Sequence, residues 1–138
     1  MTVLATEPLS IADAAAKTGI STHTLRFYER EGLLTAPVAR NGSGWRRYSP
    51  KDLEWIVVCT KLRATGMPLR AIRRYAELVR SGPGNEVERL ALLEEHQSVL
   101  RARLAELREN MELIDYKVDV YKKRLADGDA DELWSAQR

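Results

Sequence analysis

A heptad pattern of apolar residues in the last third of the chain constrains its fold more than any other feature. Between Leu90 and Leu125, ten of eleven positions spaced alternately by three and four residues are apolar, which is the pattern of a coiled-coil seam. Neither proline nor glycine occurs in residues 85–126. One continuous helix of roughly 60 Å can therefore carry the seam, at about 1.5 Å per residue.

This seam predicts a homodimer. A single helix of this length has no core of its own, so its apolar stripe needs a second helix. The alternative is that the helix packs back onto the front of the chain. The residues that we expect at the dimer interface are Leu93, Leu100, Leu104, Leu107, Met111, Ile114, Val118 and Tyr121.

The charge distribution divides the chain at its one dense cluster of turn residues, Ser81-Gly82-Pro83-Gly84. Residues 1–80 contain 13 Lys and Arg against 7 Asp and Glu, whereas residues 81–138 contain 9 against 13. A basic front half attracts polyanions such as nucleic acid. We predict a DNA-binding domain over residues 8–80, a dimerisation helix over 85–125 and a tail over 126–138.

Two short helices are predicted near the N-terminus. Ser10 can cap a helix from Ile11 to about Lys17, which Gly19 ends, and Ser21 can cap a second helix that Gly32 closes. Two short helices joined by a glycine turn are typical of a helix-turn-helix.

The next segment predicts a hairpin followed by two more helices. A glycine-rich tip, Asn41-Gly42-Ser43-Gly44, precedes a basic run at residues 45–48, as in a β-hairpin. Ser49, Pro50 and Asp52 then provide an N-cap, an N-terminal proline and an acid at the third helical position. The fold class is thus mainly α.

These elements together favour recognition of DNA. A helix that enters the major groove, side chains that bind phosphate and a device that spaces two such units are the parts required. The alternative is a small basic domain whose charges are merely solvated. The predicted DNA-contacting residues are Thr22, His23, Thr24, Arg26 and Tyr28 in the second helix and Arg40, Arg46, Arg47 and Tyr48 in the hairpin.

Other function classes are disfavoured by the composition. With one cysteine and two histidines, the chain has no disulfide and no cluster at metal-ligand spacing, and we expect neither metal nor cofactor. The acids at residues 127–132 resemble a calcium loop only loosely, because no glycine stands at the required position and the closing glutamate is missing. An enzyme would need Cys59 with His23 or His96, which lie on other predicted elements. We expect a cytoplasmic protein without a membrane span.

The sequence from Leu9 to Val79 resembles the N-terminal domain of MerR-family bacterial transcription regulators. The matching segments are LSIADAAAKTGISTHTLRFYEREGLL, GWRRYSPKDLEWI and LRATGMPLRAI, in that order. The resemblance implies a winged helix-turn-helix followed by an antiparallel coiled-coil dimer, with Thr24, Arg26 and Tyr28 on the recognition helix and Arg46, Arg47 and Tyr48 on the wing. Phe27 departs from the family, which commonly has tyrosine there.

The resemblance also implies a mechanism. Family members bind promoters whose polymerase recognition elements are too far apart, and they kink and untwist the DNA so that both elements come into phase. Double-stranded promoter DNA and RNA polymerase are therefore the expected partners. Bending a site of 20 to 30 base pairs requires about 1 to 6 kcal/mol, which phosphate contacts from the wing must offset.

The signal is less well defined by the sequence. Cys59 has a placement similar to the lone cysteine of the aldehyde- and electrophile-responsive branch, although a lone cysteine among apolar neighbours is more often a core residue. A second hypothesis is a small apolar site formed by Tyr116, Tyr121 and Trp134. A third, from another function class, is a coiled-coil adaptor that binds no specific DNA.

Overall fold

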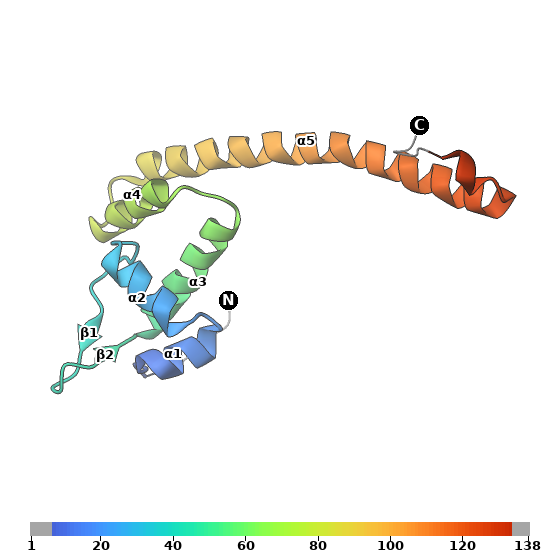
Figure 1. Cartoon of the computed structure of the whole chain (residues 1–138). Coiled ribbons are helices and arrows are strands. Elements are labelled where there is room, and N and C mark those ends of the chain that lie inside the picture. The colour runs from blue at the N-terminus through green and yellow to red at the C-terminus, as the bar shows by residue number, and fades with distance from the viewer. Residues whose placement is uncertain (1–6, 134–138) are drawn as a thin grey trace. The chain divides into compact units, whose positions relative to one another are not determined.

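The structure is a computed structural model that describes residues 7–133. Its elements, in chain order, are α1 (Ile11–Thr18), α2 (Thr22–Arg30), β1 (Ala39–Arg40), β2 (Arg46–Arg47), α3 (Pro50–Ala64), α4 (Leu69–Arg80), α5 (Glu86–Asp127) and the short 3-10 helix η1 (Ala130–Glu132). The chain forms two compact units that meet between His96 and Gln97, and α5 runs through both (Figure 1).

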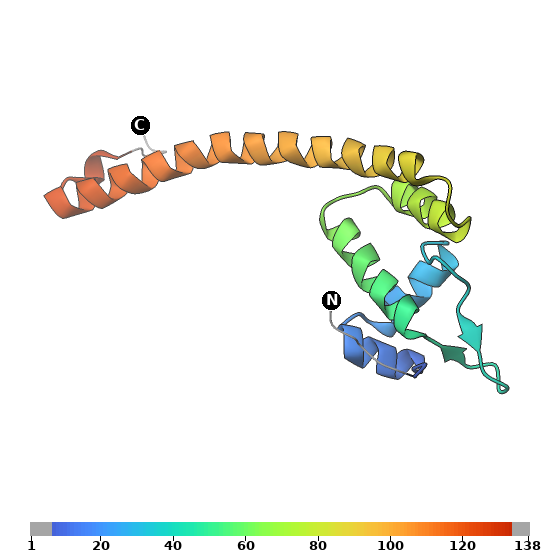
Figure 2. The same cartoon turned by 180° about the vertical axis from the view of Figure 1, so that it is seen from behind.

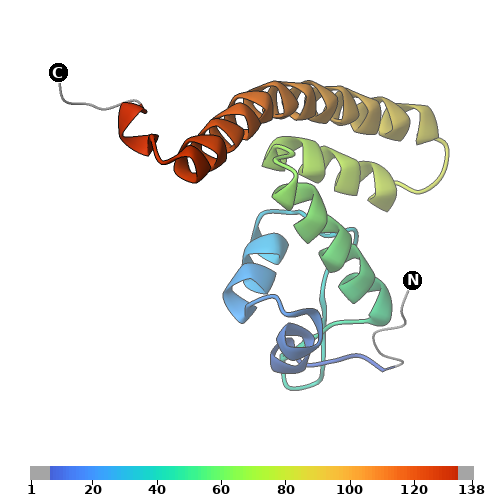
Figure 3. The ribbon, with the colours of Figure 1, turned by 90° about the vertical axis from the view of Figure 1, so that its right-hand side faces the viewer.

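Helices α1 and α2 form the helix-turn-helix that the sequence predicts. Ser10 and Ser21 cap them by accepting hydrogen bonds from the backbone N–H groups of Asp13 and Thr24. Gly19 ends α1 with φ of 74°, in the left-handed region that glycine adopts without a steric penalty. Helix α1 packs beside both α2 and α3 (Figure 3), so α2 has a packed support.

The hairpin of β1 and β2 is a small wing that projects from these helices (Figure 2). Its strands pair antiparallel over two residues each. At the tip, the Asn41 side-chain oxygen accepts hydrogen bonds from the backbone N–H groups of Ser43 and Trp45, both at 3.0 Å. At the base, Leu9 and Tyr48 exchange two backbone hydrogen bonds of 2.8 Å, which attach the wing to the segment before α1.

Helices α3 and α4 complete the core of the first unit. Ser49 and Asp52 form the predicted capping box at the start of α3. Leu53, Ile56 and Ile72 are fully buried together with Leu25 of α2. Burying each such side chain contributes about 1.5 to 3 kcal/mol, before the cost in chain entropy. This shared core joins α2 to the helices that lead to α5.

The start of α5 is fastened to α4 within the first unit. Arg89 donates hydrogen bonds to the carbonyl oxygens of Leu78 and Gly82, and the Asn85 side chain donates to the same Leu78 carbonyl. Arg74 of α4 pairs with Glu88 at 2.6 Å. These contacts satisfy carbonyl groups that the end of a helix leaves without partners, so the α4–α5 turn is a hydrogen-bonded joint.

Helix α5 contains no buried residue. Its 42 residues include apolar side chains that are half exposed or more, among them Leu107 at 65% and Met111 at 53%. Arg124 near its end pairs with Asp129 and Glu132. Within residues 7–133, no helix has the length and hydropathy that crossing a bilayer requires.

Candidate nucleic-acid interface

The exposed face of α2 carries basic side chains at helical spacing. His23, Arg26 and Arg30 are exposed and lie three and four residues apart, whereas Leu25 and Tyr28 on the opposite face are buried. Residues with this spacing share one face of a helix. Helix α2 therefore presents one imidazole and two guanidinium groups outward, of which sequence reasoning missed Arg30.

The predicted threonines lie at the N-terminal end of this face. Thr22 and Thr24 are half-buried, and the Ser21 hydroxyl donates a 2.9 Å hydrogen bond to the Thr24 hydroxyl oxygen. The Thr24 hydroxyl proton is then left to donate elsewhere. Hydroxyls and N–H groups at a helix N-terminus are suitable phosphate ligands.

Two of the predicted DNA-contacting residues, Tyr28 and Tyr48, are core residues in the structure. They are 1% and 0% exposed, so their side chains do not reach an external ligand. The Tyr28 hydroxyl makes a 2.7 Å hydrogen bond with that of Thr60 on α3. Burial raises the pKa of Tyr48, and the nearby charge of Glu29 raises it further. The aromatic rings of both residues fill the core, which the prediction from the family pattern did not take into account.

The Phe27 ring, at the position where the resemblance leads one to expect tyrosine, packs against two guanidinium groups. The guanidinium carbons of Arg63 and Arg30 lie 5.2 Å and 5.7 Å from the centre of its ring, within the range of cation–π attraction. Arg63 also lies 5.4 Å from the Tyr28 ring. The aromatic ring thus brings an arginine from α3 next to one from α2, and sequence spacing contains no signal for this pair.

The wing arginines are joined to α2 through Glu29. Arg46 donates from Nε to the Glu29 carboxylate at 2.5 Å, and Arg40 lies 3.5 Å from the same carboxylate. Arg47 is half-buried. Trp45 at the tip is 70% exposed. Glu29 and Arg46 are 17 residues apart in the sequence, and their ion pair joins the wing directly to α2.

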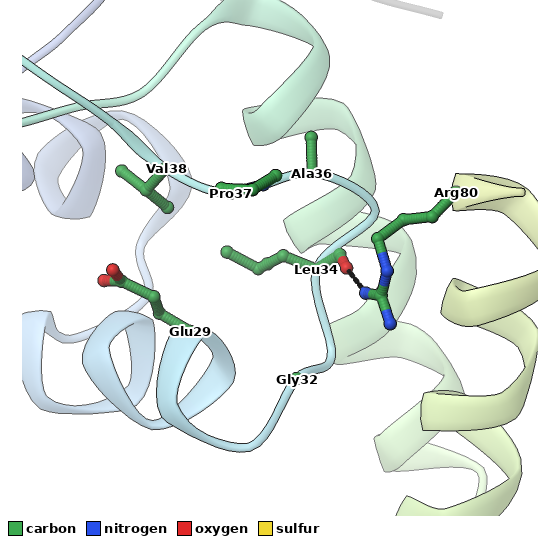
Figure 4. A pocket seen from close by; sticks show the side chains of 7 residues that line it. All are labelled: Glu29, Gly32, Leu34, Ala36, Pro37, Val38 and Arg80. Carbon is green, nitrogen blue, oxygen red and sulfur yellow. Dashed lines mark hydrogen bonds between the residues drawn. The ribbon is translucent and has the colours of Figure 1, made fainter.

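A hollow of about 330 Å³ lies between α2, the α2–β1 loop and the end of α4 (Figure 4). Its polar groups already have partners, since Glu29 binds the wing arginines and Arg80 donates to the Leu34 carbonyl. The remaining lining is apolar side chains and backbone of the α2–β1 loop. The hollow is therefore lined mostly by apolar groups, and both of its charged side chains already bind neighbouring groups.

Cys59 lies in the core of the first unit and is 0% exposed. Burial raises the pKa of its thiol from 9.0 to about 11, against a smaller lowering by the charge of Arg63. At neutral pH the reactive thiolate is therefore scarce. This environment favours the alternative that Cys59 is a core residue.

The predicted dimerisation residues all lie along α5 with apolar surface accessible. Leu100 is half-buried, and the other seven are between 37% and 65% exposed. The second sensing hypothesis places a small apolar site at Tyr116, Tyr121 and Trp134. Tyr116 and Tyr121 are 66% and 43% exposed, while Trp134 lies outside the described residues.

Comparison with known proteins identifies this architecture. Residues 9–78, from the strand-like segment before α1 to the last turn of α4, match the model of the MerR HTH family of regulatory proteins. The chain belongs to the MerR family. The prediction of a MerR-type winged helix-turn-helix with a long C-terminal helix is thereby confirmed.

Relatives of the full architecture support this assignment. An HTH-type transcriptional regulator of Haemophilus influenzae is 43% identical over 117 residues, which cover 85% of this chain and 86% of that protein. The crystal structure of HiNmlR, a MerR family regulator lacking the sensor domain and bound to promoter DNA, superposes with a TM-score of 0.78 at 40% identity, covering 91% of this chain and 99% of that one.

A Listeria monocytogenes protein assigned to the MerR family of transcriptional regulators is similar in the same way. Its TM-score is 0.83 at 33% identity, over 89% of this chain and 92% of that one. This MerR chain is thus a transcriptional regulator in which the long helix α5 follows the winged helix-turn-helix.

Proposed function

We propose that this MerR regulator binds promoter DNA as a homodimer, with α2 in the major groove and the wing on the flanking phosphates. The observation that carries the proposal is the outward face of His23, Arg26 and Arg30 on a helix whose other face is buried. Arginine reads guanine edges in the major groove, and arginine and lysine bind phosphate. The HiNmlR structure, which is bound to promoter DNA, supports this assignment.

The dimer is proposed from the exposed seam of α5. A stripe of large apolar side chains along a helix without buried residues exceeds what a soluble monomer ordinarily exposes. Pairing of two α5 helices covers the stripe and places two recognition helices at a fixed spacing, as a two-fold operator requires.

We further infer that the chain is not an enzyme and that RNA polymerase is its partner at the promoter. Its relatives are transcriptional regulators. Cys59, the one candidate nucleophile, is buried with a raised pKa. The inducing signal stays a prediction with two candidate regions, Cys59 and the end of α5 near Tyr116 and Tyr121.

Two substitutions test the proposed function on duplexes that the protein selects from a random-sequence pool. Arg26→Ala should raise the dissociation constant by the equivalent of about 1 to 3 kcal/mol at particular bases, because a bidentate base contact is lost. Arg47→Ala should weaken all duplexes alike and lower the slope of log affinity against log salt by about 0.9, as expected for one phosphate contact. Fluorescence anisotropy across a salt series measures both effects.

Equal weakening of every duplex by Arg26→Ala would make Arg26 a phosphate ligand and leave base recognition to His23. Selection that enriches no sequence at all would contradict the proposed function and favour the coiled-coil adaptor.

A further inference from the structure

Glu29 is an acidic side chain in the middle of an otherwise basic surface. It is the carboxylate of α2 that faces the wing, and it contacts an arginine from each strand, Arg46 at 2.5 Å and Arg40 at 3.5 Å. An acid beside DNA phosphates reduces affinity through charge repulsion. A contribution of Glu29 to DNA binding that compensates for this loss of affinity would account for its position.

The wing is attached at its base, where Val38 and Tyr48 are buried in the core of the first unit. Each strand pairs over only two residues, and an isolated two-stranded hairpin is at best marginally stable in water. Its base is held by the Leu9–Tyr48 pairing. Glu29 adds a second attachment further out, directly to the recognition helix.

The two arginines use their N–H groups differently. Arg40 donates through one terminal nitrogen to the Gly44 carbonyl at 3.1 Å and directs the other toward Glu29. Arg46 binds Glu29 through Nε, and within residues 7–133 its two terminal nitrogens make no hydrogen bond. Four N–H groups of Arg46 are thus available while Nε stays on the carboxylate.

We propose that Glu29 is a positioning residue of the DNA interface, which orients the Arg46 guanidinium and the wing relative to the exposed face of α2. A guanidinium held through Nε presents its terminal N–H groups in a fixed direction, which suits bidentate binding of a phosphate. The ion pair is partly exposed, with side chains 27% and 25% accessible, so it holds an orientation without being permanently buried.

This role rests on the proposed function and predicts how discrimination among DNA sequences depends on Glu29. Without the carboxylate, Arg46 and Arg40 become mobile charges that any phosphate backbone attracts, because phosphate contacts are independent of sequence. Binding to unrelated DNA then strengthens, while binding to the selected sequence loses its oriented contact. Both changes lower the ratio of specific to non-specific affinity.

The test compares Glu29→Gln with Glu109→Gln in the full-length dimer. Glu109 is an exposed residue of α5, so its substitution changes net charge equally and leaves the wing intact. The probes are a duplex of about 30 base pairs that the wild type selects from a random pool and a scrambled duplex of the same composition, titrated between about 50 and 200 mM salt.

Glu29→Gln should lower the affinity ratio roughly tenfold, equivalent to about 1.4 kcal/mol. Its salt slope on the scrambled duplex should steepen by about 0.9 for each arginine released, while Glu109→Gln matches the wild type. The double variant Glu29→Gln with Arg46→Gln should lower the affinity ratio by less than the sum of the two single effects in free energy, because the two residues act as a pair.

The positioning role would be overturned if Glu29→Gln kept the wild-type ratio of specific to non-specific affinity and the wild-type salt slope, at an unchanged melting temperature. A lowered melting temperature with an unchanged slope would also overturn it, since Glu29 would then only stabilise the fold. Failure of the wild type to prefer the selected duplex would be a failure of the proposed function itself.

Discussion

The unit up to His96 and the remainder of α5 bury their apolar residues in different ways. In the first unit, Leu25, Leu53, Ile56 and Ile72 are 0% exposed and pack in one core. Along α5, whose seam has similar residue types, no residue is buried. The first unit therefore buries its apolar residues through contacts within the chain, whereas those of α5 stay accessible to the second chain of the proposed dimer.

The largest expected effect comes from placing charges in the seam. The double substitution Leu107→Asp with Ile114→Asp should give monomers and abolish specific DNA binding, because paired helices would bury unpaired carboxylates. Analytical ultracentrifugation measures the mass. The fold of the first unit should persist in circular dichroism, since its core lies elsewhere.

A matched control for this prediction is Leu113→Asp, which changes an exposed leucine of α5 outside the seam. This variant should remain a dimer. If the double variant sediments as a dimer as well, the seam has been misassigned.

A smaller effect distinguishes the two regions by how their thermal stability depends on protein concentration. Leu53→Ala should destabilise the first unit by about 2 to 5 kcal/mol, the usual range for a buried leucine, at every protein concentration. Leu104→Ala should weaken the dimer, so its melting temperature should rise as protein concentration rises.

Leu113→Ala provides the reference for an exposed leucine and should change stability by less than about 0.5 kcal/mol. A concentration-independent effect of Leu104→Ala would mean that this residue packs within its own chain.

The local elements of both regions could be predicted from the sequence. Caps at Ser10, Ser21 and Ser49 act through residues three positions away, and such short-range signals are visible in a sequence. The seam of α5 is equally local, because one helical period defines it.

The arrangement of the interface could not be predicted in the same way. Glu29 meets Arg46 across 17 positions, and Arg63 reaches Tyr28 across 35. Such pairs depend on how α2 packs against the wing and α3, which no spacing rule encodes. The burial of Tyr28 had a partial signal, because it lies one turn after Leu25 on the face of α2 that packs on the core.

The smallest expected effect concerns the ionisation of Cys59 in the buried core. Burial raises the pKa of its thiol from 9.0 to about 11, so the folded chain retains a proton that the unfolded chain releases first. The stabilisation is complete below pH 9 and is lost as pH rises toward 11. Tyr48, whose pKa is also raised, contributes in the same direction, so a comparison with Cys59→Ala is needed to isolate the cysteine.

Urea unfolding of the wild type and Cys59→Ala at a series of pH values makes this comparison. Cys59→Ala should be less stable at neutral pH, because a buried side chain is truncated, but its stability should decline less steeply above pH 9. Parallel declines would mean that the thiol ionises as readily in the folded state as in the unfolded one. A thiol of that kind would form thiolate at lower pH and react with electrophiles, which would favour Cys59 over the end of α5 as the site of sensing.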